Sequence, residues 1–142
     1  MNRTEGDSIT DYYIEFDEIK NCHYQQVNGK ALGRFEHESL VNTSSLNITS
    51  SMFEIDATIY HYLTSETVTL RSKSSDKSVI IKFPGFTYLG LWSTPAAPYI
   101  CIEPWYGVDD YIHFNGDLME EDRVEIIDSD EQFSCEYRIQ IG

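Results

Sequence analysis

Short alternations of apolar and polar residues, separated by turn-forming residues, run along the whole chain. The clearest alternation spans 133–141, where apolar residues take the odd positions and polar residues the even ones, which predicts a terminal strand with one wet face. Further strands are predicted at 11–16, 67–72, 78–83, 88–92, 99–102 and 123–127. No segment shows a helical period longer than a turn or two. Closely spaced strands form sandwiches or barrels, so we expect one all-β domain over 1–142 with no internal linker.

Some connections between these strands have strong turn signals, and others are ambiguous. Residues 67–83 predict a hairpin closed by 74–77, and Asn28-Gly29 is a strong turn signal. The stretch 42–51 is rich in Ser, Thr and Asn, which predicts a loop or an irregular edge. The stretch 53–63 fits either a strand or a short helical turn followed by a strand.

The segment 99–102 is almost wholly apolar, so we expect a strand buried on both faces. Pro104 is expected to end that strand. Cys101 is then expected to point into the core, and it has no basic neighbour in sequence that would make it a nucleophile.

The composition restricts the possible partners. The 142 residues carry a formal net charge of −14, which disfavours nucleic acids and anionic membranes but suits a neutral partner such as a sugar. No apolar run approaches the roughly 20 residues of a membrane span, and no signal peptide is evident. The three cysteines form no zinc or disulfide pattern. We therefore expect a cytoplasmic protein that needs no metal.

Glu103 is the strongest candidate for chemistry. It follows a run of buried-type residues, so its carboxylate is expected to be partly desolvated and hence a better base. Trp105 and Tyr106 beside it offer flat faces on which a sugar ring can stack. The alternative is that Glu103 only caps a turn or pairs with a surface cation.

The residues around Glu103 resemble a known family. Trp92-Ser93 followed by 98–110, PYICIEPWYGVDD, is similar to the central motif of the aldose 1-epimerase (galactose mutarotase) family, in its short bacterial branch. Weaker likenesses at 11–17, 52–57 and 133–139 follow in the family's order. The resemblance implies a β-supersandwich of the galactose mutarotase type, of which this chain would be the C-terminal part.

The resemblance also implies an activity and roles for single residues. Family members interconvert the α and β anomers of aldoses by acid–base ring opening and closure, without a cofactor. Glu103 matches the family's catalytic base, and Asp56 matches a residue that binds sugar hydroxyls. Trp105 and Trp92 would line or support the pocket, although both fit the core equally and for Trp92 the core is the preferred interpretation. The implied partner is a monosaccharide, a hexose.

This chain departs from the family in its histidines. The family's catalytic histidine lies upstream of the motif that 11–17 resembles, and nothing here matches it. The chain's own histidines are His23, His37, His61 and His113. His61 and His113 could approach the pocket, while the other two fit the surface. Residues 120–124 also replace a lysine-glycine turn of the family.

Three functions remain open from the sequence. The chain is either part of a sugar epimerase with little activity of its own, a non-catalytic carbohydrate-binding module, or a remnant whose exposed edges promote association. If the chain is part of a sugar epimerase, its substrate is expected to be a neutral rather than a phosphorylated sugar, because no Lys or Arg lies between Lys82 and Arg123.

Overall fold

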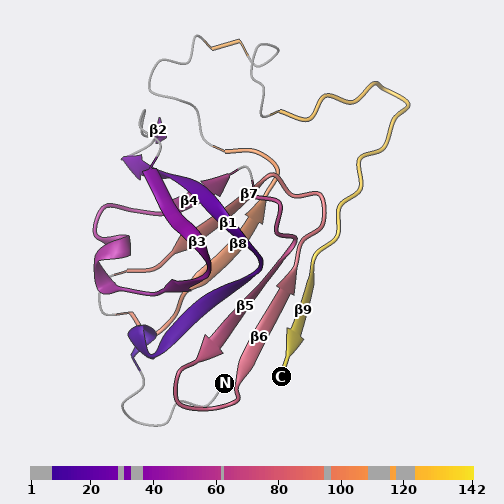
Figure 1. Ribbon diagram of the computed structural model, residues 1–142. Coiled ribbons are helices and arrows are strands. Elements are labelled where there is room, and N and C mark those ends of the chain that lie inside the picture. The colour runs from indigo at the N-terminus through magenta and orange to yellow at the C-terminus, as the bar shows by residue number, and fades with distance from the viewer. Residues whose placement is uncertain are drawn as a thin grey trace.

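The computed structural model describes residues 8–28, 31–32, 37–61, 63–94, 97–108, 116–117 and 124–142. These form nine strands of one sheet and two short 3-10 turns, so the predicted all-β class is confirmed (Figure 1). The strands are β1 (Tyr12–Asn28), β2 (Ala31–Leu32), β3 (His37–Asn47), β4 (Thr58–His61), β5 (Thr67–Ser72), β6 (Ser78–Lys82), β7 (Tyr88–Trp92), β8 (Cys101–Trp105) and β9 (Arg138–Ile141). The turns are η1 (Ile9–Asp11) and η2 (Ser50–Phe53).

The long strand β1 organises the sheet, whose order is β8-β7-β4-β1-β5-β6-β9 (Figure 1). Its first half pairs with β5 and its second half with β4, while β3 pairs along its other edge. The β1–β3 register shifts between Glu15 and His23. Such shifts add local bend and twist, which lets one strand serve both halves of the sheet.

Two apolar clusters lie on opposite faces of this sheet. Side chains alternate between faces along a strand, and directly paired residues share a face. The larger cluster is built from Ile14, Phe16, Tyr60, Val68, Phe83, Leu89 and Leu91, all buried. The smaller one contains Val27, Ala57 and Ile59, with Tyr88, Trp92, Trp105 and Val108 packed against it. The smaller cluster lies on the face that carries Glu103.

Several predicted elements are confirmed. The hairpin over 67–83 forms from β5 and β6, and β7 has the predicted bounds. For 53–63 the prediction of a helical turn followed by a strand is correct in order but not in bounds, because η2 ends at Phe53 and β4 covers only Thr58–His61. Asn28 pairs with Ala31, but the predicted turn itself lies at 29–30, outside the described residues.

The loop predicted at 42–51 is wrong for its first part, because β3 extends to Asn47. The alternative of an irregular edge fits better. Its backbone pairs with β1 through a shifted register. Ser, Thr and Asn side chains suit a strand whose one face is wet, so composition alone did not separate it from a loop.

The strand predicted at 99–102 is displaced and less buried than expected. β8 begins at Cys101 and continues through Pro104 to Trp105, all partly buried, while Tyr99 is exposed. The prediction that Pro104 ends the strand is wrong because β8 lies at the end of the strand order. Proline lacks a ladder donor, and an edge position tolerates that loss.

The C-terminal predictions are only partly correct. The described residues 124–127 form no strand, and the terminal strand is limited to β9. Ile139 and Ile141 do face the same side as the large cluster, since they pair with Ile81 and Val79. They nevertheless remain 60% and 82% exposed, so the expected buried face is open here.

Candidate functional site

Glu103 projects from β8 into a row of residues that crosses four strands. It pairs with Gly90 of β7, which pairs with Ile59 of β4, which pairs with Gln25 of β1. Ile59 and Gln25 are buried, and Glu103 is half-buried. The Glu103 carboxylate is therefore the solvent-accessible end of this row, and the residues farther along the row are buried.

The indole of Trp105 lies over Gly90, directly beside this row. A Cβ at position 90 would come within 3.1 Å of Cζ2 and 3.3 Å of Cε2 of Trp105. Trp105 is two residues from Glu103 on the same strand and therefore shares its face. Glycine at 90 thus leaves room for the indole of Trp105 to pack closely against the sheet, next to the Glu103 carboxylate. The structure brings these two predicted site residues together.

We expect Gly90→Ala to disturb this aromatic plane. The added methyl group would be too close to the indole ring, which must shift, and overpacking of this kind costs about 1–3 kcal/mol. Urea unfolding should show that loss, and near-UV circular dichroism should show an altered tryptophan signal. Thr87→Ala, at an exposed position just before β7, is the matched control and should change neither. Unchanged stability and an unchanged spectrum for Gly90→Ala would contradict the close contact.

Asp56 lies apart from Glu103 and Trp105. It is half-buried in the connection before β4, and its Oδ1 accepts a hydrogen bond of 2.8 Å from the backbone N–H of Ala57. β7 lies between β4 and β8, so these strands are roughly 10 Å apart, and Asp56 lies three residues before Ile59, the residue of β4 in line with Glu103, which adds roughly 10 Å along the strand direction. This spacing excludes direct contact between the two carboxylates, so the structure does not bring Asp56 together with Glu103.

Trp92 also belongs to the Glu103 face. It pairs with Cys101 and packs against the small cluster, and its ring centroid is 6.1 Å from that of Tyr99. Trp92 is only partly buried. It therefore supports the floor of the site and extends it toward the start of β4.

The prediction that Cys101 points into the core is wrong. It is half-buried and shares the face of Glu103, two residues away. Burial raises the pKa of the Cys101 thiol, and the charge of Glu103 with a hydrogen bond to its side chain raises it further. The thiol therefore stays protonated and can donate to the Glu103 carboxylate.

This contact predicts the reactivity of Cys101. Glu103→Gln removes the negative charge, so the pKa of Cys101 should fall and its thiolate fraction should rise. At a fixed mildly alkaline pH, alkylation of Cys101 by iodoacetamide, followed by peptide mass spectrometry, should become faster than in the unchanged protein. Glu66→Gln, an exposed carboxylate outside this face, is the control and should leave the rate unchanged. A slower or equal rate in Glu103→Gln would show that the carboxylate does not act on the thiol.

The other aromatic and histidine candidates fall in different places. Tyr106 turns away from Trp105 and packs on Phe86, with ring centroids 4.4 Å apart, so it is not part of the stacking surface. His61 does lie on the Glu103 face, where it pairs with Tyr88, but it is buried. His113 lies outside the described residues.

Gln25, Tyr88 and Gly90 were not selected from the sequence. The alternation Tyr88-Leu89-Gly90 could have indicated that Tyr88 and Gly90 share a face, but only the β7–β8 register places that face beside Glu103. Gln25 had no such signal because β1 is irregular upstream of it.

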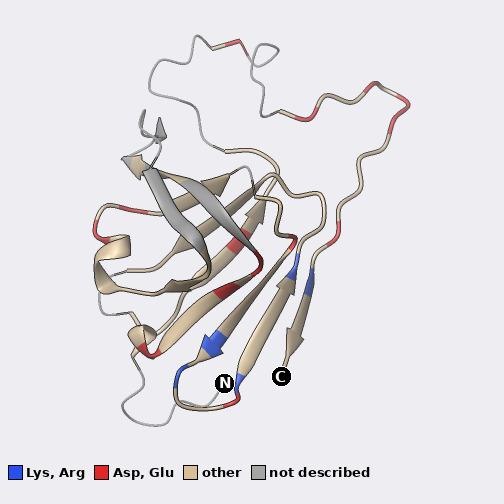
Figure 2. Ribbon diagram, in the orientation of Figure 1, with Lys and Arg blue, Asp and Glu red and all other residues tan. Residues whose placement is uncertain are grey.

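Charge is distributed unevenly around the sheet. Lys and Arg gather on β5, β6 and β9, whereas β4, β7 and β8 contain none (Figure 2). Arg71 of β5 is paired with Glu15, with Nε 2.6 Å from Oε2. The strands around Glu103 thus offer no described cation to a phosphate group.

Two further features of the described residues bear on function. No group of three or more His, Cys, Asp or Glu side chains in this part of the chain could hold a metal ion. No helix in it is long and apolar enough to cross a membrane.

Comparison with known proteins finds sequence relatives but no matching family model. No protein-family model matches the chain. The plasmid and chromosomal LacX proteins of Lactococcus lactis subsp. lactis are each 34% identical over 122 residues, which cover 82% of this chain and 40% of each relative. The chain thus spans less than half of the length of these relatives.

Solved structures show the same fold. A galactose mutarotase related enzyme from Lactobacillus acidophilus matches with a TM-score of 0.88 and 22% identity, over 100% of this chain and 48% of that one. A galactose mutarotase-like protein from Lactobacillus casei matches with a TM-score of 0.63 and 20% identity, over 71% of this chain and 36% of that one. The chain therefore has the fold of galactose mutarotase-like structures, and in sequence it is similar to part of the LacX proteins.

Proposed function

We propose that this chain carries the base-bearing part of an aldose 1-epimerase site, with Glu103 as the general base. The observation that carries the proposal is the juxtaposition on β8 of a half-buried carboxylate and the indole of Trp105, which packs closely over Gly90. The names of the structural neighbours and the resemblance of 98–110 to the family motif support the same function.

In the proposed reaction, Glu103 takes the proton from the C1 hydroxyl of the sugar. The C1–O5 bond breaks as O5 gains a proton from an acid, and an open-chain aldehyde forms. Rotation about C1–C2 and the reverse steps then close the ring on the other face of C1. Such proton transfers by one positioned group contribute about 10²–10⁴-fold.

The acid in this reaction is not assigned. His61 lies on the Glu103 face but is only 5% exposed, which disfavours direct contact with a substrate oxygen. A base without its partner retains only a part of the rate, so we expect weak activity from this chain.

The substrate that fits this proposal is an uncharged hexose. Trp105 would stack on the C–H face of the ring. Asp56 precedes His61, the residue of β4 in line with Trp105, by five residues, so one hexose cannot contact both, and the proposed hexose site rests on Glu103 and Trp105. The absence of Lys and Arg from β4, β7 and β8 disfavours a phosphorylated sugar. We propose a cytoplasmic location on the sequence argument alone.

Polarimetry of freshly dissolved α-D-galactose and α-D-glucose tests this function. The proposal predicts a faster approach to anomeric equilibrium with the protein than in buffer. A rate equal to that of buffer would refute catalysis by this chain.

The second candidate is a non-catalytic carbohydrate-binding module, which the exposed part of Trp105 and its neighbour Trp92 favours. It predicts a saturable change of tryptophan fluorescence on addition of galactose without faster mutarotation. If the protein neither binds galactose nor accelerates mutarotation, the third function remains, a remnant without sugar chemistry. The exposed apolar side chains of Ile139 and Ile141 would then promote its association.

A further inference from the structure

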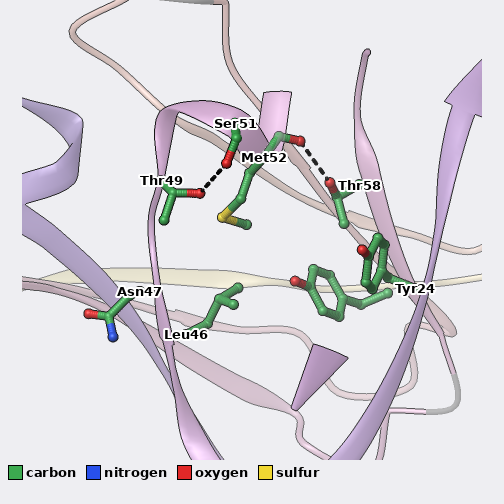
Figure 3. Close-up of a pocket in the computed structure, with 8 residues that line it drawn as sticks. Tyr24, Leu46, Asn47, Thr49, Ser51, Met52 and Thr58 are labelled. Carbon is green, nitrogen blue, oxygen red and sulfur yellow. Dashed lines mark hydrogen bonds between the residues drawn. The ribbon is translucent and has the colours of Figure 1, made fainter. Parts of the chain in front are cut away.

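An open hollow lies at the junction of β1, β3, η2 and β4, and Figure 3 shows the residues that line it. Its volume is about 250 Å³, and it is lined by Tyr24, Leu46, Asn47, Thr49, Ser51, Met52, Thr58 and Tyr60. We refer to it as the Tyr24–Tyr60 pocket. A water molecule occupies roughly 30 Å³ of liquid, so this volume exceeds what one structural water fills. It also lies just below the roughly 300 Å³ at which drug-sized sites begin.

The Tyr24–Tyr60 pocket is separated from Glu103 by the sheet itself. Tyr24 pairs with Tyr60, which pairs with Leu89, which pairs with Pro104. This row is adjacent to the row that ends in Glu103, and adjacent rows project to opposite faces. A molecule in the pocket therefore cannot touch Glu103.

The lining of the pocket is uncharged, although the chain as a whole is strongly acidic. Six of its residues bear a hydroxyl or a carboxamide, and Leu46 and Met52 supply the apolar part. The ring of Tyr24 is partly exposed to the pocket, and the ring of Tyr60, which is 1% exposed, packs against it with centroids 5.8 Å apart at 38°. Such a lining excludes ions and favours a neutral molecule that has both hydroxyls and C–H surfaces.

The hydroxyls of the rim are held in place and keep hydrogen-bonding capacity. Thr58 Oγ1 donates to the carbonyl of Met52 at 3.4 Å, which leaves its lone pairs as acceptors (Figure 3). The hydroxyls of Thr49 and Ser51 share one hydrogen bond of 3.1 Å, which commits only one of their two protons. Both a donor and acceptors therefore remain for a ligand.

We propose that the Tyr24–Tyr60 pocket is a second ligand site, which takes an uncharged polyol of monosaccharide size independently of the Glu103 face. The ring of Tyr24 and the side chain of Met52 contact the C–H surface of the polyol. The hydroxyls of Thr49, Ser51 and Thr58 bind its hydroxyl groups.

Met52 provides a local reporter for the test. The chain has three methionines, so a protein labelled with ¹³C at the methionine methyl groups gives a simple spectrum in which Met52→Leu identifies the Met52 signal. D-galactose, D-sorbitol and myo-inositol are titrated as neutral probes, with inorganic phosphate as the charged one. We expect a saturable shift of the Met52 signal with at least one neutral probe and none with phosphate.

Variants assign the binding to this pocket. Thr58→Val keeps the shape of the side chain and should weaken binding about tenfold, as loss of one hydrogen bond does. Ser51→Ala, at an exposed rim position, should weaken it similarly without any effect on folding. Thr87→Val, an exposed threonine elsewhere, and Glu103→Gln should leave the titration midpoint unchanged.

Each other outcome overturns the proposal. No shift with any neutral probe would show that only water fills the pocket. A shift that Glu103→Gln abolishes would place the ligand on the other face, and an equal shift with phosphate would refute the uncharged class. Because the readout is the Met52 signal, the result is distinct from any failure of mutarotation.

Discussion

Glu103→Gln is expected to lower the protein-dependent rate of α-D-galactose mutarotation at least about 100-fold, the lower end of what one general base contributes. The amide keeps the size of the side chain but cannot accept the C1 hydroxyl proton. Its position on an edge strand, half-exposed, leaves the packing of Ile59 and Gln25 behind it untouched. The rate is followed by polarimetry from the freshly dissolved anomer.

The matched control for this prediction is Glu66→Gln, which removes a carboxylate of the same charge from an exposed site before β5. It should retain the full protein-dependent rate. A Glu103→Gln protein as active as the unchanged chain would exclude Glu103 as the base. Equal losses in both variants would show that net charge, not a positioned base, governs the rate.

Leu89→Ala is expected to reduce the free energy of unfolding by about 2–5 kcal/mol, the usual range for truncating a buried leucine. Leu89 is fully buried between Tyr60 of β4 and Pro104 of β8, on the face opposite to Glu103. Its loss leaves a cavity directly beneath the strands that position the site. Urea unfolding followed by tryptophan fluorescence measures the change.

Ile55→Ala is the control for Leu89→Ala. Ile55 is 62% exposed in the connection before β4, so its truncation should change the stability by no more than about 0.5 kcal/mol. Similar losses in the two variants would contradict the assignment of Leu89 to the central core.

Much of the fold was predictable from local patterns. The hairpin of β5 and β6 and the strand β7 follow from alternation and turn residues, which act within a few positions of the chain. The bounds of β8 could not be predicted in this way. A strand can continue through Pro104 only at the edge of a sheet, and only the complete strand order shows that β8 is an edge strand. The exposure of Ile139 depends likewise on what covers the sheet, and alternation carries no information about that.

The candidate site could be predicted only where its residues are close in sequence. Glu103 and Trp105 are neighbours in sequence on one strand, so a motif could indicate both. The role of Gly90 as the floor beneath Trp105 depends on the pairing of two strands. The divergence of Tyr106 from Trp105 follows from alternation and could have been expected.

The most direct test of the proposed sugar site is saturation-transfer NMR on a Trp92→Phe protein, in which Trp105 is the single remaining tryptophan. Saturation of the indole protons should pass to the ring protons of D-galactose. The transfer should disappear when Trp105 is also replaced by leucine. No transfer from Trp105, or transfer unchanged by its replacement, would contradict a sugar site on the Glu103 face.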